Sequence, residues 1–208
     1  MRRSTSTILS RALAIVAAFL VTLLVACTDG GDGATGPDNL PDAVPATTVP
    51  ADTASGLLVN MLLWNTPLAS DEVVTKLIGS SGGTVELRGA STIKLIVPRG
   101  AVLTYTNFTI TRRAGRIVSY DFQPHGARFL VPVRIEQETR GTNFSTLSSA
   151  AVIQAVYFVD TGLVDQLAGT LVAEEFLETG VTLSKDKVLF STSHFSAYGV
   201  STGRRPQQ

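Results

Sequence analysis

Residues 79–101 read GSSGGTVELRGASTIKLIVPRGA, and this stretch decides the fold. In residues 84–88 and again in residues 92–97, apolar side chains occupy every second position, which is the period of a strand with one buried face. A glycine-rich turn precedes the first segment. The turn at residues 98–101 ends the second, because proline cannot donate to a strand ladder. The expected inward residues are Val85, Leu87, Ile93, Leu95 and Val97.

The same alternation continues along the chain and predicts further short strands. They are expected at residues 108–111, 117–122, 131–136, 188–190 and 195–200. The inward side chains are Val118, Tyr120 and Phe122, opposite Ile117, Ser119 and Asp121, and later Val131, Val133 and Ile135. Val152–Val159 is more continuously apolar and predicts a central strand, whereas Thr170–Leu177 fits a strand or a helical turn. Many short strands with Gly, Pro and Asn turns predict an all-β fold, an antiparallel β-sandwich.

Upstream of these strands the composition changes. Residues 28–56 carry five aspartates, recurrent prolines, clustered glycines and no basic residue. Such a segment buries too little apolar surface to offset its ordering entropy, so we expect residues 27–56 to be a disordered tether and residues 57–208 to be the folded domain. Leu57–Trp64, the first apolar run of the domain, fits a short helix or a strand added at the domain's edge. We expect it to pack on the domain rather than on a membrane surface.

The first residues have the organisation of an export signal. Arg2, Arg3 and Arg11 precede Ala12–Ala26, an almost wholly apolar run that reads ALAIVAAFLVTLLVA. This run has the length of a signal-peptide core and is shorter than the roughly 20 residues that cross hydrocarbon. A secretory signal without lipidation and an uncleaved membrane helix are the alternatives.

Leu24-Val25-Ala26-Cys27 closes the apolar run and resembles the bacterial lipobox. The resemblance implies that residues 1–26 are a lipoprotein signal peptide and that Cys27 carries a diacylglyceryl thioether. Each buried CH₂ contributes about 0.8 kcal/mol, so two or three acyl chains hold a protein in a bilayer essentially permanently. Thr28 stands where an aspartate resembles an inner-membrane retention signal in diderm bacteria, which favours the outer membrane over the inner one.

Charge and cysteine content exclude some functions. The chain has 17 basic and 17 acidic residues, and the three arginines of the first segment leave 14 basic residues in the rest. A mildly acidic mature protein does not fit nonspecific nucleic-acid binding, which needs a clustered positive face. Cys27 is the only cysteine, so stability has to come from an apolar core rather than from an intramolecular disulfide.

Three motifs, in this order, resemble the ZU5 domain. The first pairs GGTV at residues 82–85 with VPRGA at 97–101, as a GGT-hydrophobic start and a hydrophobic-P-x-G-A turn. The second is YDFQPHG at residues 120–126, and the third is SHFSAY at 193–198. The resemblance spans about residues 78–200. It implies a β-sandwich interaction module rather than an enzyme, as in ankyrins and netrin receptors. The spectrin-contacting residues of ankyrin match no motif in this chain.

His194-Phe195-Ser196 is the candidate for chemistry. In some ZU5-associated signalling proteins an HFS site cleaves itself, so the resemblance implies attack by the Ser196 hydroxyl on the Phe195 carbonyl. In a regular strand His194 and Ser196 share a face at about 6.6 Å, too far for the roughly 3 Å hydrogen bond of a base. We therefore expect Phe195 in the core, Ser196 and Tyr198 on the opposite face, and an intact chain.

Other sites are not expected. His125 lies in a turn, His194 is the only other histidine, and no metal-ligand spacing is present. The glycine-rich residues 79–83 lack the Gly-Lys-Ser/Thr ending of a phosphate loop. Arg112, Arg113 and Arg116 are expected at a solvated strand end. No cofactor is expected either.

Together these features predict a non-enzymatic cell-envelope lipoprotein. A lipid on Cys27 anchors it to the membrane, and its ZU5-like domain contacts a protein or a glycan. The alternative is a self-cleaving module processed between Phe195 and Ser196. An exported hydrolase ranks third, because no Ser/His/Asp or paired-carboxylate arrangement stands out.

Overall fold

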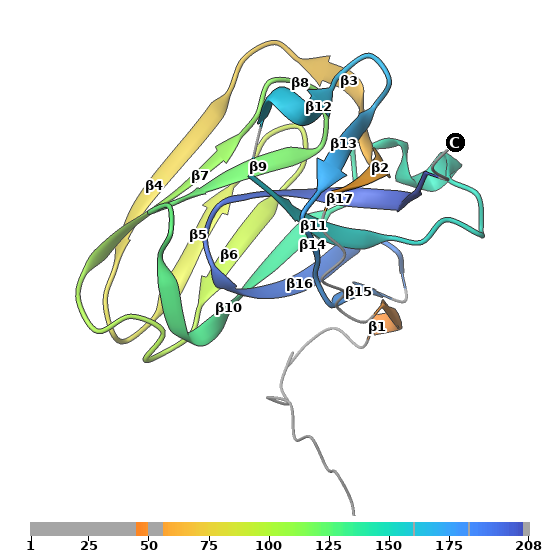
Figure 1. The fold of residues 1–208 in the computed structure, drawn as a ribbon. Helices are drawn as coiled ribbons and strands as arrows, with labels where there is room; N and C mark the ends of the chain where they lie inside the picture. The colour runs from red at the N-terminus through yellow and green to blue at the C-terminus, as the bar shows by residue number, and fades with distance from the viewer. Residues whose placement is uncertain (1–44, 50–55, 160, 183, 206–208) are drawn as a thin grey trace, which may run out of the picture. The chain divides into compact units, whose positions relative to one another are not determined.

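The structure, a computed structural model, describes residues 45–49, 56–159, 161–182 and 184–205 (Figure 1). The chain divides into two units, Met1–Asn39 and Leu40–Gln208, and all described residues belong to the second. The expected signal peptide at residues 1–26, the lipidation site Cys27 and most of the expected tether lie outside the described residues.

Two large sheets form an all-β sandwich, as the alternation predicts. The six-stranded sheet runs in the order β1 (Pro45–Val49), β15 (Thr179–Thr182), β16 (Lys187–His194), β10 (Arg128–Glu138), β6 (Ile93–Val97) and β5 (Gly83–Leu87). The nine-stranded sheet runs β12 (Val164–Asp165), β13 (Thr170–Ala173), β2 (Leu57–Met61), β17 (Ala197–Arg204), β9 (Ser119–Gln123), β7 (Thr106–Arg112) and β4 (Glu72–Ile78), with β11 (Gln154–Phe158) and β14 (Glu175–Phe176) branching from β17.

A third pair consists of β3 (Leu63–Leu68) and β8 (Gly115–Ile117), and two short 3₁₀ helices are η1 (Asn143–Thr146) and η2 (Thr161–Leu163). Every strand pairing among the described residues is antiparallel. The main core lies between the two large sheets, because Leu95, Ile135 and Phe190 of one sheet cluster with Phe108, Phe122 and Tyr198 of the other.

The stretch at residues 79–101 forms the edge of the six-stranded sheet. Strands β5 and β6 pair from Gly83 opposite Val97 to Leu87 opposite Ile93, and all five expected inward side chains are buried. The turn that precedes β5 requires a glycine. Gly82 has a φ of +77°, and a Cβ there would lie 2.5 Å from the carbonyl oxygen of Val97.

The expected faces of residues 117–122 are only half right. Val118, Tyr120 and Phe122 are buried as predicted, but Ile117, Ser119 and Asp121 are buried too. Ile117 ends β8 and packs in a smaller second core with residues such as Val59 and Phe176. Strand β9 lies between β7 and β17, and on its outer face Arg113 and His125 pair with Asp121.

Strand β10 departs from alternation at its start. Val133 and Ile135 are buried as expected, whereas Val131 is 38% exposed. The pairing of β10 with β16 shifts register between Arg128 and Val133, and Pro132 lies within the shifted segment. This irregularity turns Val131 out of the core, because a shifted register reverses the faces of a strand.

The apolar run Leu57–Trp64 packs on the domain, as expected, but it does not cover an edge. Its first part is β2, which lies between β13 and β17 within the nine-stranded sheet, and its end enters β3. The ambiguous segment Thr170–Leu177 forms β13 and β14 rather than a helical turn. Val152–Val159 contains β11, which pairs on both sides, although Val152 and Val159 themselves are half exposed.

Part of the expected tether is a strand. Pro45–Val49 forms β1, which pairs antiparallel with β15 at one edge of the six-stranded sheet. The pairing runs from Pro45 opposite Thr182 to Val49 opposite Thr179. The extended backbone of these residues satisfies hydrogen bonds of the β15 edge, so a polar, proline-containing segment orders without a core of its own.

The prediction of a solvated basic cluster is wrong for Arg112. Its side chain is fully buried, whereas Arg113 is 40% exposed and Arg116 is exposed. The Arg112 guanidinium donates to the Glu72 carboxylate and to the carbonyl oxygens of Leu87 (3.3 Å) and Ser91 (2.6 Å). It therefore joins the edge of the nine-stranded sheet to the loop after β5.

Candidate functional site

The HFS segment is the point where the chain passes from one sheet to the other. Strand β16 ends at His194 in the six-stranded sheet, and β17 begins at Ala197 in the nine-stranded sheet. Phe195 and Ser196 form the bend between them. The strand expected at residues 195–200 therefore begins two residues later, at Ala197, and the spacing of a regular strand does not apply to His194 and Ser196.

Phe195 lies at the centre of an aromatic cluster, as its core assignment predicts. Its ring is 4.5 Å from that of Phe129, 5.5 Å from Phe122 and 5.8 Å from Phe108, measured between centroids. These rings come from both sheets. The contacts with Phe129 and Phe108 are edge-to-face and the contact with Phe122 is stacked, and such pairs add stability beyond the buried area. The position of Phe195 fixes where the chain crosses. Tyr198 is fully buried, so its expected place on a face opposite the core is wrong.

Backbone hydrogen bonds hold the Phe195–Ser196 peptide on both sides. The Phe195 N–H donates to the carbonyl oxygen of Ala127 (3.0 Å), and the Gly126 N–H donates to the carbonyl oxygen of Phe195 (3.1 Å). The Ser196 carbonyl accepts from the N–H of Phe122 at 3.0 Å. The carbonyl that a Ser196 hydroxyl would attack thus already accepts a hydrogen bond.

The His194 side chain belongs to a polar network that does not include Ser196. Its Nε2 lies 3.2 Å from Glu175 Oε2, and its Nδ1 lies 3.1 Å from the Tyr198 hydroxyl. That hydroxyl also donates to the His194 carbonyl oxygen at 2.6 Å and lies 3.0 Å from Thr192 Oγ1. Burial raises the pKa of Tyr198, so the phenol stays protonated as a donor. Both imidazole nitrogens are therefore engaged in joining β14, β16 and β17.

The second histidine flanks the same peptide from the other side. His125 precedes Gly126, whose N–H holds the Phe195 carbonyl, and its Nε2 lies 3.2 Å from the nearer Asp121 oxygen. Asp121 is almost fully buried and also pairs with Arg113 at 3.4 Å. The sequence predicts a turn at His125 and assigns it no role. A spacing of four residues indicates contact only on a helix, so no local pattern predicts this contact between a strand and a turn.

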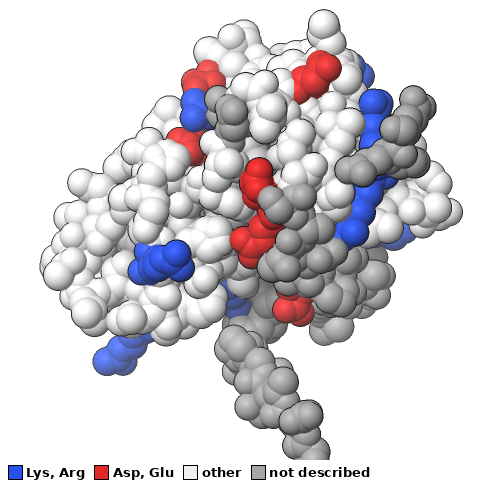
Figure 2. All heavy atoms as spheres, in the orientation of Figure 1, with Lys and Arg blue, Asp and Glu red and all other residues white. Residues whose placement is uncertain are grey.

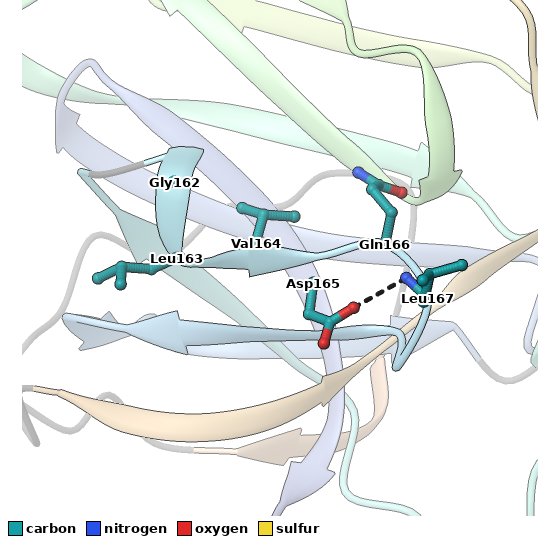
Figure 3. A pocket seen from close by; sticks show the side chains of 6 residues that line it. All are labelled: Gly162, Leu163, Val164, Asp165, Gln166 and Leu167. Atoms are coloured by element: carbon teal, nitrogen blue, oxygen red, sulfur yellow. Dashed lines mark hydrogen bonds between the residues drawn. The ribbon is translucent and has the colours of Figure 1, made fainter.

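A shallow surface hollow lies at residues 162–167 (Figure 3). Its polar side chains serve the local fold. Asp165 Oδ1 accepts the N–H groups of Leu167 and Ala168, each at 2.9 Å. Gln166 Oε1 accepts the N–H groups of Arg116 (2.8 Å) and Ile117 (3.1 Å). The Asp165 and Gln166 oxygens named above are therefore already occupied by backbone donors rather than directed at a ligand.

Within the described part of the chain, no group of three or more His, Cys, Asp and Glu residues is arranged to hold a metal ion. Among the same residues, no helix is both long enough and apolar enough to cross a bilayer. Comparison with known proteins gives no matching family model and no matching curated protein.

Proposed function

We propose that the chain is a lipoprotein of the bacterial cell envelope that is anchored through Cys27 and displays a non-enzymatic, ZU5-like β-sandwich to a protein or glycan. One observation carries the anchor: Leu24-Val25-Ala26-Cys27 ends an apolar run behind three arginines, and Cys27 is the only cysteine. Thr28 after it favours the outer membrane. The segment between Cys27 and β1 is acidic, contains no basic residue and is long enough to separate the domain from the anchor.

The arrangement of the ZU5-like motifs supports the display domain. The GGTV motif leads into β5, and VPRGA is the turn after β6. The YDFQPHG motif covers most of β9 and the turn that holds the Phe195 carbonyl, and SHFSAY is the crossover itself. All three motifs thus meet around one core. Both ring nitrogens of His194 already have partners, Glu175 and the Tyr198 hydroxyl, which supports a structural role for this histidine.

The anchor is tested by replacing Cys27 with alanine. Wild-type protein in cells fed labelled palmitate should carry label, and Cys27→Ala should carry none, because the thioether has no sulfur on which to form. Thr28→Ala is the matched control and should stay labelled. Label on the Cys27→Ala protein would refute the lipobox assignment.

Self-processing is the second candidate, and the bend at Ser196 is the observation that favours it. In that reaction Ser196 Oγ attacks the Phe195 carbonyl carbon, the peptide C–N bond breaks, and the proton passes to the released Ser196 amine. Water then hydrolyses the ester, leaving a carboxylate on Phe195 and restoring the hydroxyl. The Gly126 N–H stands at the carbonyl oxygen, but the imidazole of His194 is bound by Glu175 and Tyr198.

We expect the chain to stay intact, because both ring nitrogens of His194 already contact other partners, Glu175 and Tyr198. Denatured wild-type protein should give one mass that runs to Gln208, and Ser196→Ala should cost at most about 1 kcal/mol of stability. Ser193→Ala is the control, because Ser193 is an exposed residue of β16. If the wild-type mass corresponds to a chain that ends at Phe195, and only the Ser196→Ala variant has the full-length mass, self-processing is established instead.

A further inference from the structure

Three loops meet at one end of the sandwich, and together with the first residues of β5 and β10 we call them the tip: residues 79–83, 98–105 and 124–131. The Gly100 N–H donates to the Ser80 carbonyl at 2.9 Å, which joins the first loop to the second. The Leu130 N–H donates to the Ala101 carbonyl at 3.2 Å, which joins the second to the third. The tip is therefore one connected surface at the lower left of Figure 1, beyond the ends of β4 and β6.

The tip exposes large apolar side chains. Leu103, Tyr105 and Leu130 are 77%, 79% and 70% exposed, and Leu77 at the end of β4 is 57% exposed. The ring of Tyr105 lies beside Gly79, where an added Cβ would be 2.9 Å from it. Exposed apolar residues gathered at one place are characteristic of interaction surfaces in soluble domains.

The charge of the tip has one sign. Its three loops contain Arg99 and Arg128, both exposed, and no acidic residue. Lys76 lies nearby on β4 and donates to the carbonyl of Thr84. In Figure 2 this end of the molecule shows blue and white atoms and no red ones, whereas the acidic side chains in view lie elsewhere. This single sign contrasts with a chain that has as many acidic as basic residues.

We propose that the tip docks on a bilayer surface that contains anionic phospholipid. Leucine side chains enter the boundary between headgroups and acyl chains, and tyrosine settles at the headgroup level. Arginine and lysine beside them attract anionic headgroups, each strengthening binding about fivefold. A protruding set of loops with apolar tips fits a flat bilayer, whereas a protein ligand for exposed leucines is expected to need a groove.

The distance to the membrane suits this contact. Residues 28–44 separate Cys27 from β1, and 17 residues of chain reach at most about 60 Å. A bilayer within that reach is present at high effective concentration, so weak docking suffices. This step rests on the proposed lipid anchor, but the contact between the tip and lipid does not.

Amide hydrogen exchange of the full chain tests the docking. Vesicles of phosphatidylcholine with phosphatidylglycerol should slow exchange about tenfold in residues 101–105 and 128–131. Vesicles of phosphatidylcholine alone should slow it less, and high salt should weaken the effect of the anionic lipid. The loop at residues 162–167, which also exposes leucines, should exchange at the same rate with and without vesicles.

Variants separate the tip from other apolar surface. Leu103→Ser with Leu130→Ser should abolish the protection, and Leu163→Ser with Leu167→Ser, the matched pair on the other exposed loop, should preserve it. The four side chains are between 47% and 91% exposed, so thermal melts should show both proteins folded. No protection with anionic vesicles, or equal protection in the tip variant, would overturn the proposal. Protection of the tip by another protein but not by vesicles would overturn it too and assign a protein partner.

The outcome is independent of the anchor. Cys27→Ala chains should show the same protection of the tip, since the contact uses the domain alone. A wild-type protein that carries no palmitate label but still shows protection of the tip would refute the anchor only. A labelled protein without protection would refute the docking only.

Discussion

Replacing Phe122 with alanine should lower the free energy of unfolding by about 3–5 kcal/mol. The Phe122 ring is fully buried on β9, which lies in the interior of its sheet. Its centroid is 5.5 Å from that of Phe195 and 5.7 Å from that of Tyr198, so the truncation removes a ring from the centre of the sandwich. The neighbouring strands are held by backbone pairing and collapse only partly into the cavity. Urea denaturation followed by circular dichroism measures the loss.

The control for this prediction is Leu167→Ala, at a side chain that is 91% exposed. Its denaturation midpoint should equal that of the wild type. The aromatic cluster predicts a further result: Phe195→Ala should lose a comparable amount, and the double variant should lose less than the two single losses added, because the rings share contacts. A Phe122→Ala midpoint close to the wild type would mean that the ring lies outside the core.

The inward face of the strands could be predicted because apolar and polar residues alternate within each short segment of sequence. Val85, Leu95 and Phe122 all follow from alternation alone, since a strand with one wet face must separate its apolar and polar side chains. Asp121 shows the limit. Its burial results from Arg113 and His125, which reach over it from other segments, and alternation carries no information about such cover.

Local sequence patterns could not predict the order of the strands in the sheets either. The apolar run that contains β2 signals burial, but its insertion between β13 and β17 depends on partners more than 100 residues later in the chain. The predicted inward position of Val131 is wrong for a related reason, because the register shift in β10 results from its pairing with β16. The pairing of β1 with β15 could not be read from a segment whose composition is typical of tethers.

The candidate site was identified by motif, but its geometry depends on the two sheets. His194 continues the pairing of β16 with β10, and Ala197 joins β9, so the two intervening residues have to bend. No glycine or proline marks this crossover in the sequence. Glu175, which binds His194, comes from the segment that fitted a strand or a helical turn equally well. The motif names the residues, and only the fold shows that the two imidazole nitrogens of His194 contact Glu175 and Tyr198.

Arg112→Ala should lower the free energy of unfolding by about 3 kcal/mol, because the buried guanidinium satisfies several partners at once. The change removes the cation beside Glu72 and the donor to the carbonyls of Leu87 and Ser91, and it leaves a cavity near Trp64, whose ring lies 5.4 Å from the guanidinium carbon. Glu72 is 38% exposed, so water relieves part of its loss and keeps the cost below that of a fully buried pair.

The matched control is Arg116→Ala, four residues along and exposed, whose unfolding midpoint should not move. Arg112→Lys separates charge from geometry. An ammonium group keeps the attraction to Glu72 but cannot reach three acceptors with a planar fork, so its loss should lie between those of the wild type and the alanine variant. Equal midpoints for Arg112→Ala and Arg116→Ala in urea would show that Arg112 is as solvated as its neighbour. The contact between β4 and the loop after β5 would then have to depend on backbone pairing and apolar packing alone.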